Sequence, residues 1–257
     1  MRRCLQILTF LAALTACGAA QALDAAKLDS INKAADAFIT LAKDSSKTGK
    51  APRYNDAAAK QLLDAVLNTK ELEGGKPLPW EQIELLYNWN QAVNKIGVVY
   101  YLAGTGTNDV AAVAKDTQLI IRANQNTANF APEFGVYYDA KIRLFSAMVD
   151  CAATKLATAA PDQLKDADFK NALNAVSDGT VQAIAGLLGT FVQDRLPEDW
   201  LLMRTAMLLE LTPKAAKFIS PEGREIIKNA AFEVAQQIQN PDVKSGVNAI
   251  ARAMQMM

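Results

Sequence analysis

The sequence contains no histidine, and chemistry that depends on an imidazole is therefore excluded. Without histidine the chain cannot form a Ser-His-Asp triad, a Cys-His nucleophile pair or a histidine-containing zinc site. It also lacks the one side chain whose ordinary pKa lies near neutral pH, so it has no imidazole-based pH sensor. No motif in the sequence indicates a cofactor or a bound metal.

Cysteine is scarce as well, because the chain has only Cys4, Cys17 and Cys151. Cys4 and Cys17 lie in the N-terminal segment that is predicted below to be an export signal. Cys151 then has no intramolecular partner, which excludes a disulfide framework, and cysteine zinc clusters are excluded too. We interpret Cys151 as a small buried hydrophobic residue, and an intermolecular disulfide is the alternative.

The chain has neither an excess of charge nor a long apolar run after its first residues. Its 27 basic and 27 acidic residues give no clustered positive surface, so a nucleic-acid partner is not expected. No apolar run beyond residue 22 reaches the ~20 residues that span a bilayer. The longest, 181–192, is predicted to be a buried helix in which Gly186 and Gly189 permit close packing.

The first 22 residues predict an export signal peptide. Arg2 and Arg3 provide the basic start, residues 5–16 are apolar, and Ala20-Gln21-Ala22 has the small side chains that signal peptidase requires. Cleavage there would make residues 23–257 the mature protein. The predicted location is then the periplasm or the extracellular medium.

A second ending of the same signal remains open. Leu14-Thr15-Ala16-Cys17 resembles a bacterial lipoprotein signal, in which residues 1–16 are removed and Cys17 is acylated. The resemblance implies a protein anchored by lipid in the outer membrane. That lipid is then its membrane contact, since no transmembrane helix is predicted.

Helical periodicity runs through almost the whole mature sequence, and no segment alternates with the period of a strand. We therefore predict an all-α fold, a single domain of about ten helices packed as irregular antiparallel pairs. A degenerate helical-repeat superhelix is the alternative. The predicted helices are 24–43, 56–70, 80–103, 108–129, 135–158, 162–177, 180–193, 198–211, 213–219, 222–239 and 242–256.

Two ion pairs are expected from residue spacing. Asp139 precedes Arg143 by four residues on the polar side of the 135–158 helix, which favours a surface ion pair. Arg204 interrupts an apolar run, so it is expected to be partly buried and to need an acidic partner. Glu210 or an acid on another helix could supply that partner.

Residues 80–145 contain ten of the eighteen aromatic side chains and form the candidate binding region. Tyrosine and asparagine follow one another at helical spacing in the 80–103 helix, with Gly97 leaving a gap, and the next helix carries an amide-rich stripe. If these faces met, they would form a groove for a polar organic ligand such as a sugar or a peptide. The alternative is that they mark the border between core and solvent. The predicted ligand-binding residues are Tyr87, Asn90, Asn94, Tyr101, Gln118 and Arg122.

Two classes of function remain. The first is a non-enzymatic helical binding or scaffold module of the bacterial envelope, whose partner is a polar organic ligand, a peptide, a polymer or an envelope protein. The second is a histidine-free, carboxylate-dependent hydrolase or lyase that acts on glycans. The second requires a buried acid with a raised pKa in a cleft, whereas the acids of this chain fall on predicted polar faces and helix starts. The first class is favoured, and no catalytic residue is assigned.

Overall fold

The structure is a computed structural model that describes residues 23–73, 77–192 and 197–255. Within these ranges the chain is helical and has no strand, which confirms the all-α prediction. The predicted export signal, including Cys17 and the cleavage site, lies outside the described residues. The α-helices are α2 (Ala25–Leu41), α3 (Ser45–Thr48), α4 (Ala57–Leu67), α5 (Ile83–Tyr101), α6 (Val110–Val113), α7 (Thr117–Asn129), α8 (Ala131–Thr158), α9 (Ala167–Thr190), α10 (Glu198–Ala215), α11 (Pro221–Gln237) and α12 (Pro241–Gln255).

Side-chain caps fix where several of these helices begin. The carboxylates of Asp24 and Asp166 accept hydrogen bonds from the backbone N–H groups of the first turns of α2 and α9. The Ser220 hydroxyl does the same for α11, where Pro221 follows as the first helical residue. Each cap satisfies a backbone donor that has no partner inside the helix.

Several of the expected helix boundaries were wrong. The segments 162–177 and 180–193 form the single helix α9, because Gly179 continues the helix instead of ending it. A glycine costs only about 1 kcal/mol inside a helix, which packing of the neighbouring residues offsets. Conversely, the 108–129 segment divides into α6 and α7, because the Asp116 carboxylate caps a new helix by accepting from two N–H groups.

The third difference concerns the end of α10. The segments 198–211 and 213–219 were expected to be separate helices, but α10 continues through Pro213 to Ala215. Pro213 lies two residues before the end of the helix, so the backbone hydrogen bond that it removes belongs to the last turn.

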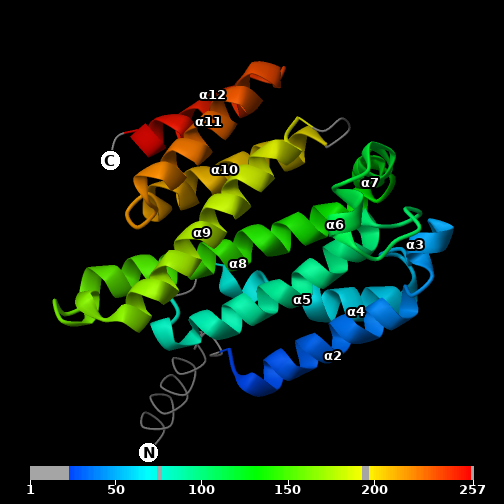
Figure 1. The fold of residues 1–257 in the computed structure, drawn as a ribbon, viewed down its shortest axis with the longest axis horizontal. Helices are drawn as coiled ribbons and strands as arrows, with labels where there is room; N and C mark the ends of the chain where they lie inside the picture. Colours follow the sequence, from blue (N-terminus) through cyan, green and yellow to red (C-terminus); the bar gives the residue numbers. More distant parts are fainter. Residues whose placement is uncertain (1–22, 74–76, 193–196, 256–257) are drawn as a thin grey trace, which may run out of the picture.

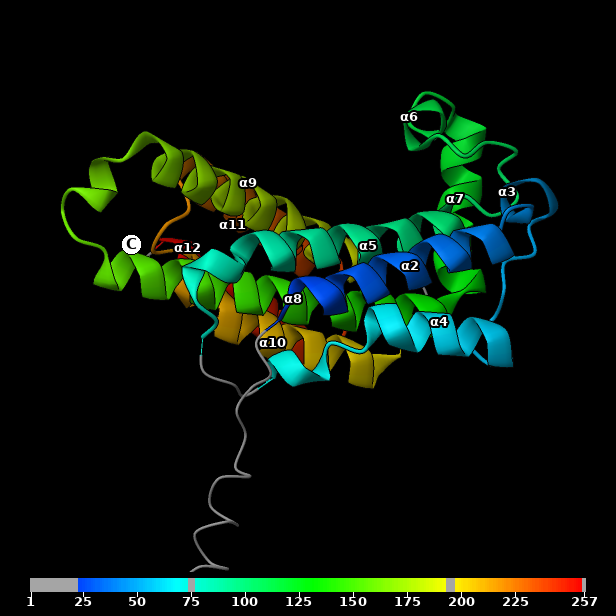
Figure 2. The same ribbon diagram turned by 90° about the horizontal axis from the view of Figure 1, so that it is seen from below.

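The long helix α8 separates two groups of helices (Figures 1 and 2). Helices α2, α4 and α5 pack on one side of it around one core cluster, and α9 to α12 pack on the other side around a second. α5 and α8 are antiparallel, since the Tyr100 ring near the end of α5 meets Phe130 just before the start of α8, at 5.2 Å between centroids. Figure 2 shows α6 and α7 projecting at one end. None of the described helices is long and apolar enough to cross a membrane.

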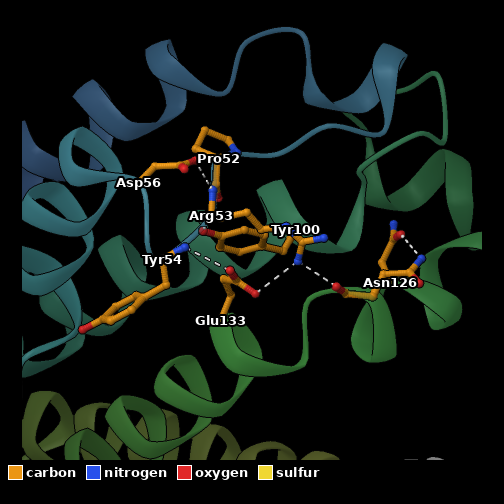
Figure 3. A network of polar contacts seen from close by, with 8 residues as sticks. Pro52, Arg53, Tyr54, Asp56, Tyr100, Asn126 and Glu133 are labelled. Atoms are coloured by element: carbon orange, nitrogen blue, oxygen red, sulfur yellow. Dashed lines mark hydrogen bonds and ion pairs between the residues drawn. The ribbon is translucent and has the colours of Figure 1, made fainter.

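A polar network ties the segment before α4 to the start of α8 (Figure 3). The Arg53 guanidinium lies 3.5 Å from the buried Glu133 carboxylate and donates a hydrogen bond of 2.7 Å to the Asn129 carbonyl. The Tyr54 backbone N–H donates to the other Glu133 oxygen at 3.0 Å. The Arg53 guanidinium also lies over the Phe130 ring. Glu133 is therefore a structural acid whose charge is balanced.

Arg204 is completely buried between α8 and α10, and its acidic partner is Asp139 on α8, at 3.6 Å. This confirms the expectation of an acid on another helix. The guanidinium also donates to the Gly135 carbonyl at 3.2 Å. The expected Asp139–Arg143 surface pair is wrong, because Asp139 turns toward Arg204 and Arg143 pairs with Glu73.

Cys151 lies in the interior, as interpreted from the sequence. Its side chain is 1% exposed, and its thiol contacts the Pro79 carbonyl oxygen at 3.4 Å. Burial, with a smaller contribution from Glu81, raises the pKa of the thiol to about 12. The side chain is thus protonated at neutral pH and unreactive.

Candidate functional site

A cleft of about 580 Å³ opens between α5, α8 and α9. α9 begins beside the start of α5, where Trp80 packs on Phe169 with 5.3 Å between ring centroids, and then diverges from α5 (Figure 1). The volume of the cleft falls within the range of small-molecule sites. We call it the α5–α8–α9 cleft. Its α5 side is lined by Tyr87, Asn90, Gln91 and Asn94, and its α8 side by Tyr137, Tyr138, Lys141 and Phe145.

Lys141 is the charged group of the α8 side. Its ammonium donates a 2.8 Å hydrogen bond to the Asn90 side-chain oxygen and a 2.7 Å hydrogen bond to that of Asn94. Asn90 and Asn94 are one helical turn apart on α5, so their amides reach the same point. The ammonium also lies 4.8 Å from the centroid of the Phe145 ring. Among the described residues, Lys141 takes part in no ion pair.

Burial lowers the pKa of Lys141 from 10.5 to about 8. The cause is loss of hydration, which disfavours the charged form and which no neighbouring carboxylate offsets. An ammonium has three N–H donors, and the two asparagine oxygens occupy two of them. The third N–H donor has no hydrogen-bond partner among the described residues.

The aromatic side of the cleft depends on Gly97. A Cβ atom at this position would lie 2.6 Å from the Tyr137 ring, which packs directly on the α5 backbone. The gap expected beside Gly97 is thus filled by Tyr137. The Tyr137 ring in turn makes an edge contact with Tyr138, at 5.1 Å between centroids. Burial raises the pKa of both tyrosines, that of Tyr138 to about 12, so both remain protonated at neutral pH.

Small and polar residues form the α9 side. Asp178 and Gln182 are its exposed polar residues, and Gly179 and Gly186 border the cleft as well. A Cβ atom added at Gly186 or at Gly189 would meet no heavy atom within 4 Å. The close packing expected of Gly186 and Gly189 was therefore wrong, since both glycines face open space. The missing side chain of Gly186 enlarges the cleft.

Comparison of the chain with protein-family models, curated proteins and solved structures finds no match.

The structure brings together three of the six predicted ligand-binding residues. Tyr87, Asn90 and Asn94 line the cleft. Tyr87 is 54% exposed, whereas Asn90 is 5% exposed and holds Lys141. Replacing Tyr87 is thus compatible with an intact core.

The other three residues lie elsewhere. Tyr101 packs against the core near the end of α5, and Gln118 is exposed on α7. The Arg122 guanidinium lies beside the turn at Gly49 and Gly104, both of which have positive φ. Of the groove expected between the 80–103 and 108–129 segments, only the 80–103 side lines the cleft. Helices α8 and α9 form its other sides, and the 108–129 segment was therefore wrongly placed there.

Lys141 was not among the predicted residues, although the sequence carries a signal for it. Its neighbours three and four positions away along the helix are Tyr137, Tyr138, Leu144 and Phe145. A lysine surrounded on its own helix face by aromatic and aliphatic side chains has no local acid to pair with. The aliphatic part of such a lysine side chain is buried together with these neighbours.

The acids outside the cleft form no metal centre within the described residues. No group of three or more Cys, Asp or Glu side chains there could hold a metal ion. Burial raises the pKa of Asp139, but this carboxyl faces Arg204 and does not line the cleft. Glu81 and Glu84, at the start of α5, are exposed.

Proposed function

We propose that the protein is a binding module whose α5–α8–α9 cleft captures a small organic anion through the ammonium of Lys141. The observation that carries this proposal is a partly buried ammonium that is held by two amide oxygens and has no acid partner among the described residues. Burying a charge without a counter-charge is unfavourable. A ligand carboxylate that accepts a hydrogen bond from the remaining N–H would compensate for this cost.

The other groups in the cleft support an organic ligand over a bare inorganic ion. Tyr87, which is exposed, offers a ring on which an apolar or aromatic group can pack, and Tyr138 and Phe145 add apolar surface to the lining of the cleft. Gln91 and Gln182 offer amide groups on opposite sides for the polar part of a ligand. Polar groups at a few positions within a mostly apolar cleft are typical of ligand sites.

The location belongs to the same proposal. The basic, apolar and small-residue segments of residues 2–22 support export from the cytoplasm, either as a free protein or with lipid on Cys17. In either form the cleft would meet ligands outside the cytoplasm.

The carboxylate-dependent hydrolase or lyase has less support. That reaction needs an acid with a displaced pKa beside the substrate. Asp139 has a raised pKa, but Arg204 and the α8–α10 packing account for its position. No observation in the cleft favours this alternative.

The proposal predicts that the cleft distinguishes a carboxylate from the matching amide. N-acetyl-L-alanyl-L-phenylalanine is a suitable probe because it combines one carboxylate, two amides and an aromatic ring. We expect it to bind about 10-fold or more tightly than N-acetyl-L-alanyl-L-phenylalanine amide, since only the first can accept a charge-assisted hydrogen bond from Lys141. Isothermal titration calorimetry at pH 7 measures the difference.

Blocking the cleft provides the matched control. Gly186→Leu is expected to eliminate binding of the carboxylate probe, because the new side chain occupies the cleft. Gly189→Leu adds the same side chain at an exposed position of α9 that does not line the cleft. This variant is expected to bind the carboxylate probe with normal affinity. Both changes favour the helix by about 0.5–1 kcal/mol. Equal binding of the acid and the amide, or equal binding by the two variants, would contradict the proposal.

A further inference from the structure

A second charge faces the cleft from α9. Asp178 is exposed and lines the cleft, whereas Lys141 lines it from α8. Within the described residues, no ion pair or side-chain hydrogen bond involves the Asp178 carboxylate. Its neighbours three and four positions away on α9 are Asn174, Ala175, Val181 and Gln182, so its own helix offers no cation.

The two charges do not neutralise one another. Lys141 and Asp178 form no ion pair, and the asparagines of α5 hold the lysine ammonium in place. The other residues that line the cleft include no aspartate, glutamate, lysine or arginine. The α5–α8–α9 cleft therefore presents a cation from α8 and an anion from α9, and aromatic and amide side chains form part of the same lining.

We infer that the ligand is a zwitterion, an amino acid or a short peptide, whose carboxylate binds Lys141 and whose ammonium binds Asp178. This inference depends on the anion-binding function proposed above. A ligand with both charges gains from both sides of the cleft, whereas a simple anion leaves the Asp178 charge without a partner and is repelled by it. Tyr87, the exposed aromatic residue of the lining, would pack against an apolar side chain of the ligand.

Four forms of one dipeptide separate the two charges. L-alanyl-L-phenylalanine carries both charges, its N-acetyl derivative only the carboxylate, its amide only the ammonium, and the N-acetyl amide neither. In the wild-type protein we expect the free dipeptide to bind about two- to fivefold more tightly than the N-acetyl derivative. This is the range for an ion pair at an exposed acid. Calorimetry at pH 7 gives the four affinities.

Asp178→Asn removes the acid without changing the shape of the side chain. We expect this variant to lose the preference for the free dipeptide over the N-acetyl derivative, and to bind the N-acetyl derivative at least as well as wild type. Asp168→Asn, at an exposed acid of the same helix outside the cleft, should keep the preference.

The outcomes distinguish failure of this inference from failure of the proposed function. Anion binding stands if the N-acetyl derivative binds more tightly than the N-acetyl amide. The zwitterion inference is nevertheless overturned if the free dipeptide has no higher affinity than the N-acetyl derivative, or if Asp178→Asn keeps the same preference for the free dipeptide. If the N-acetyl derivative binds no better than the N-acetyl amide, anion binding fails, and the inference fails with it.

Discussion

Replacing Lys141 with methionine is expected to lower the affinity for N-acetyl-L-alanyl-L-phenylalanine by about 10- to 100-fold. Hydrogen bonds to charged groups contribute about 1.5–3 kcal/mol, and methionine keeps the length of the side chain while removing both charge and donors. The aromatic and amide groups around the cleft remain, so residual weak binding of both the acid and its amide is expected. Calorimetry of the variant measures the loss.

The same substitution is expected to change the free energy of unfolding by no more than about 1 kcal/mol. It removes the cost of a poorly hydrated charge but takes a donor from the oxygens of Asn90 and Asn94, which lie beside an open cleft. Lys155→Met removes the same charge from α8 outside the cleft and should alter neither quantity. A Lys141→Met protein that is severely destabilised, or that binds the probe normally, would show that Lys141 is a structural residue.

Replacing Arg204 with alanine is expected to destabilise the protein by about 3–5 kcal/mol, as for loss of one partner of a buried ion pair. The Arg204 side chain is fully buried, lies over the rings of Tyr138 and Trp200, and provides the counter-charge for Asp139. Its removal leaves both a cavity and an unpaired, half-buried carboxylate. Urea unfolding followed by circular dichroism measures the effect.

A second pair of variants separates the charge from the volume. Arg204→Met fills most of the space but still leaves the Asp139 carboxylate unpaired, so it should remain clearly destabilised. Adding Asp139→Asn to Arg204→Met should recover part of the loss, because the unpaired charge is then gone. If Arg204→Met alone is as stable as wild type, the ion pair makes no net contribution to stability.

Lys141 and Arg204 show that the sequence can predict a buried cation but not the group that it meets. Arg204 is surrounded on its helix by Trp200, Leu201, Met207 and Leu208, just as Lys141 is surrounded by apolar and aromatic residues. In both cases the local pattern indicates a cation on an apolar helix face. Whether an acid meets it depends on the neighbouring helix: α8 brings Asp139 to Arg204, whereas α5 brings two amides to Lys141.

The fold was predictable where the information is local. Periodicity located nearly all the helices, because the 3.6-residue repeat is a property of short segments. The cleft was not fully predictable, because α9 reaches it from about 80 residues farther along the chain than α5. The sequence prediction includes the α5 residues Tyr87, Asn90 and Asn94 that line the cleft, but no residue of α8 or α9.

The misinterpreted glycines have a related cause. Gly135 was the expected first residue of the 135–158 helix but lies inside α8, where a Cβ atom would come within 2.1 Å of the Trp200 ring. Gly186 was expected to permit close packing but faces open space. A glycine in a helical sequence is compatible with a turn, a close contact or a cavity, and only the tertiary packing decides among them.

The titration of Lys141 is the sharpest test of anion binding in the α5–α8–α9 cleft. In a protein with ¹³C-labelled lysine, the Lys141 Cε resonance, assigned by its loss in Lys141→Met, reports the protonation state of the ammonium. We predict a pKa of about 8 in the free protein. A bound anion favours the charged form, so N-acetyl-L-alanyl-L-phenylalanine should raise this pKa, and its affinity should fall as the pH rises above about 8. A pKa near the ordinary lysine value of 10.5 that does not respond to the probe would contradict an anion-binding cleft at Lys141.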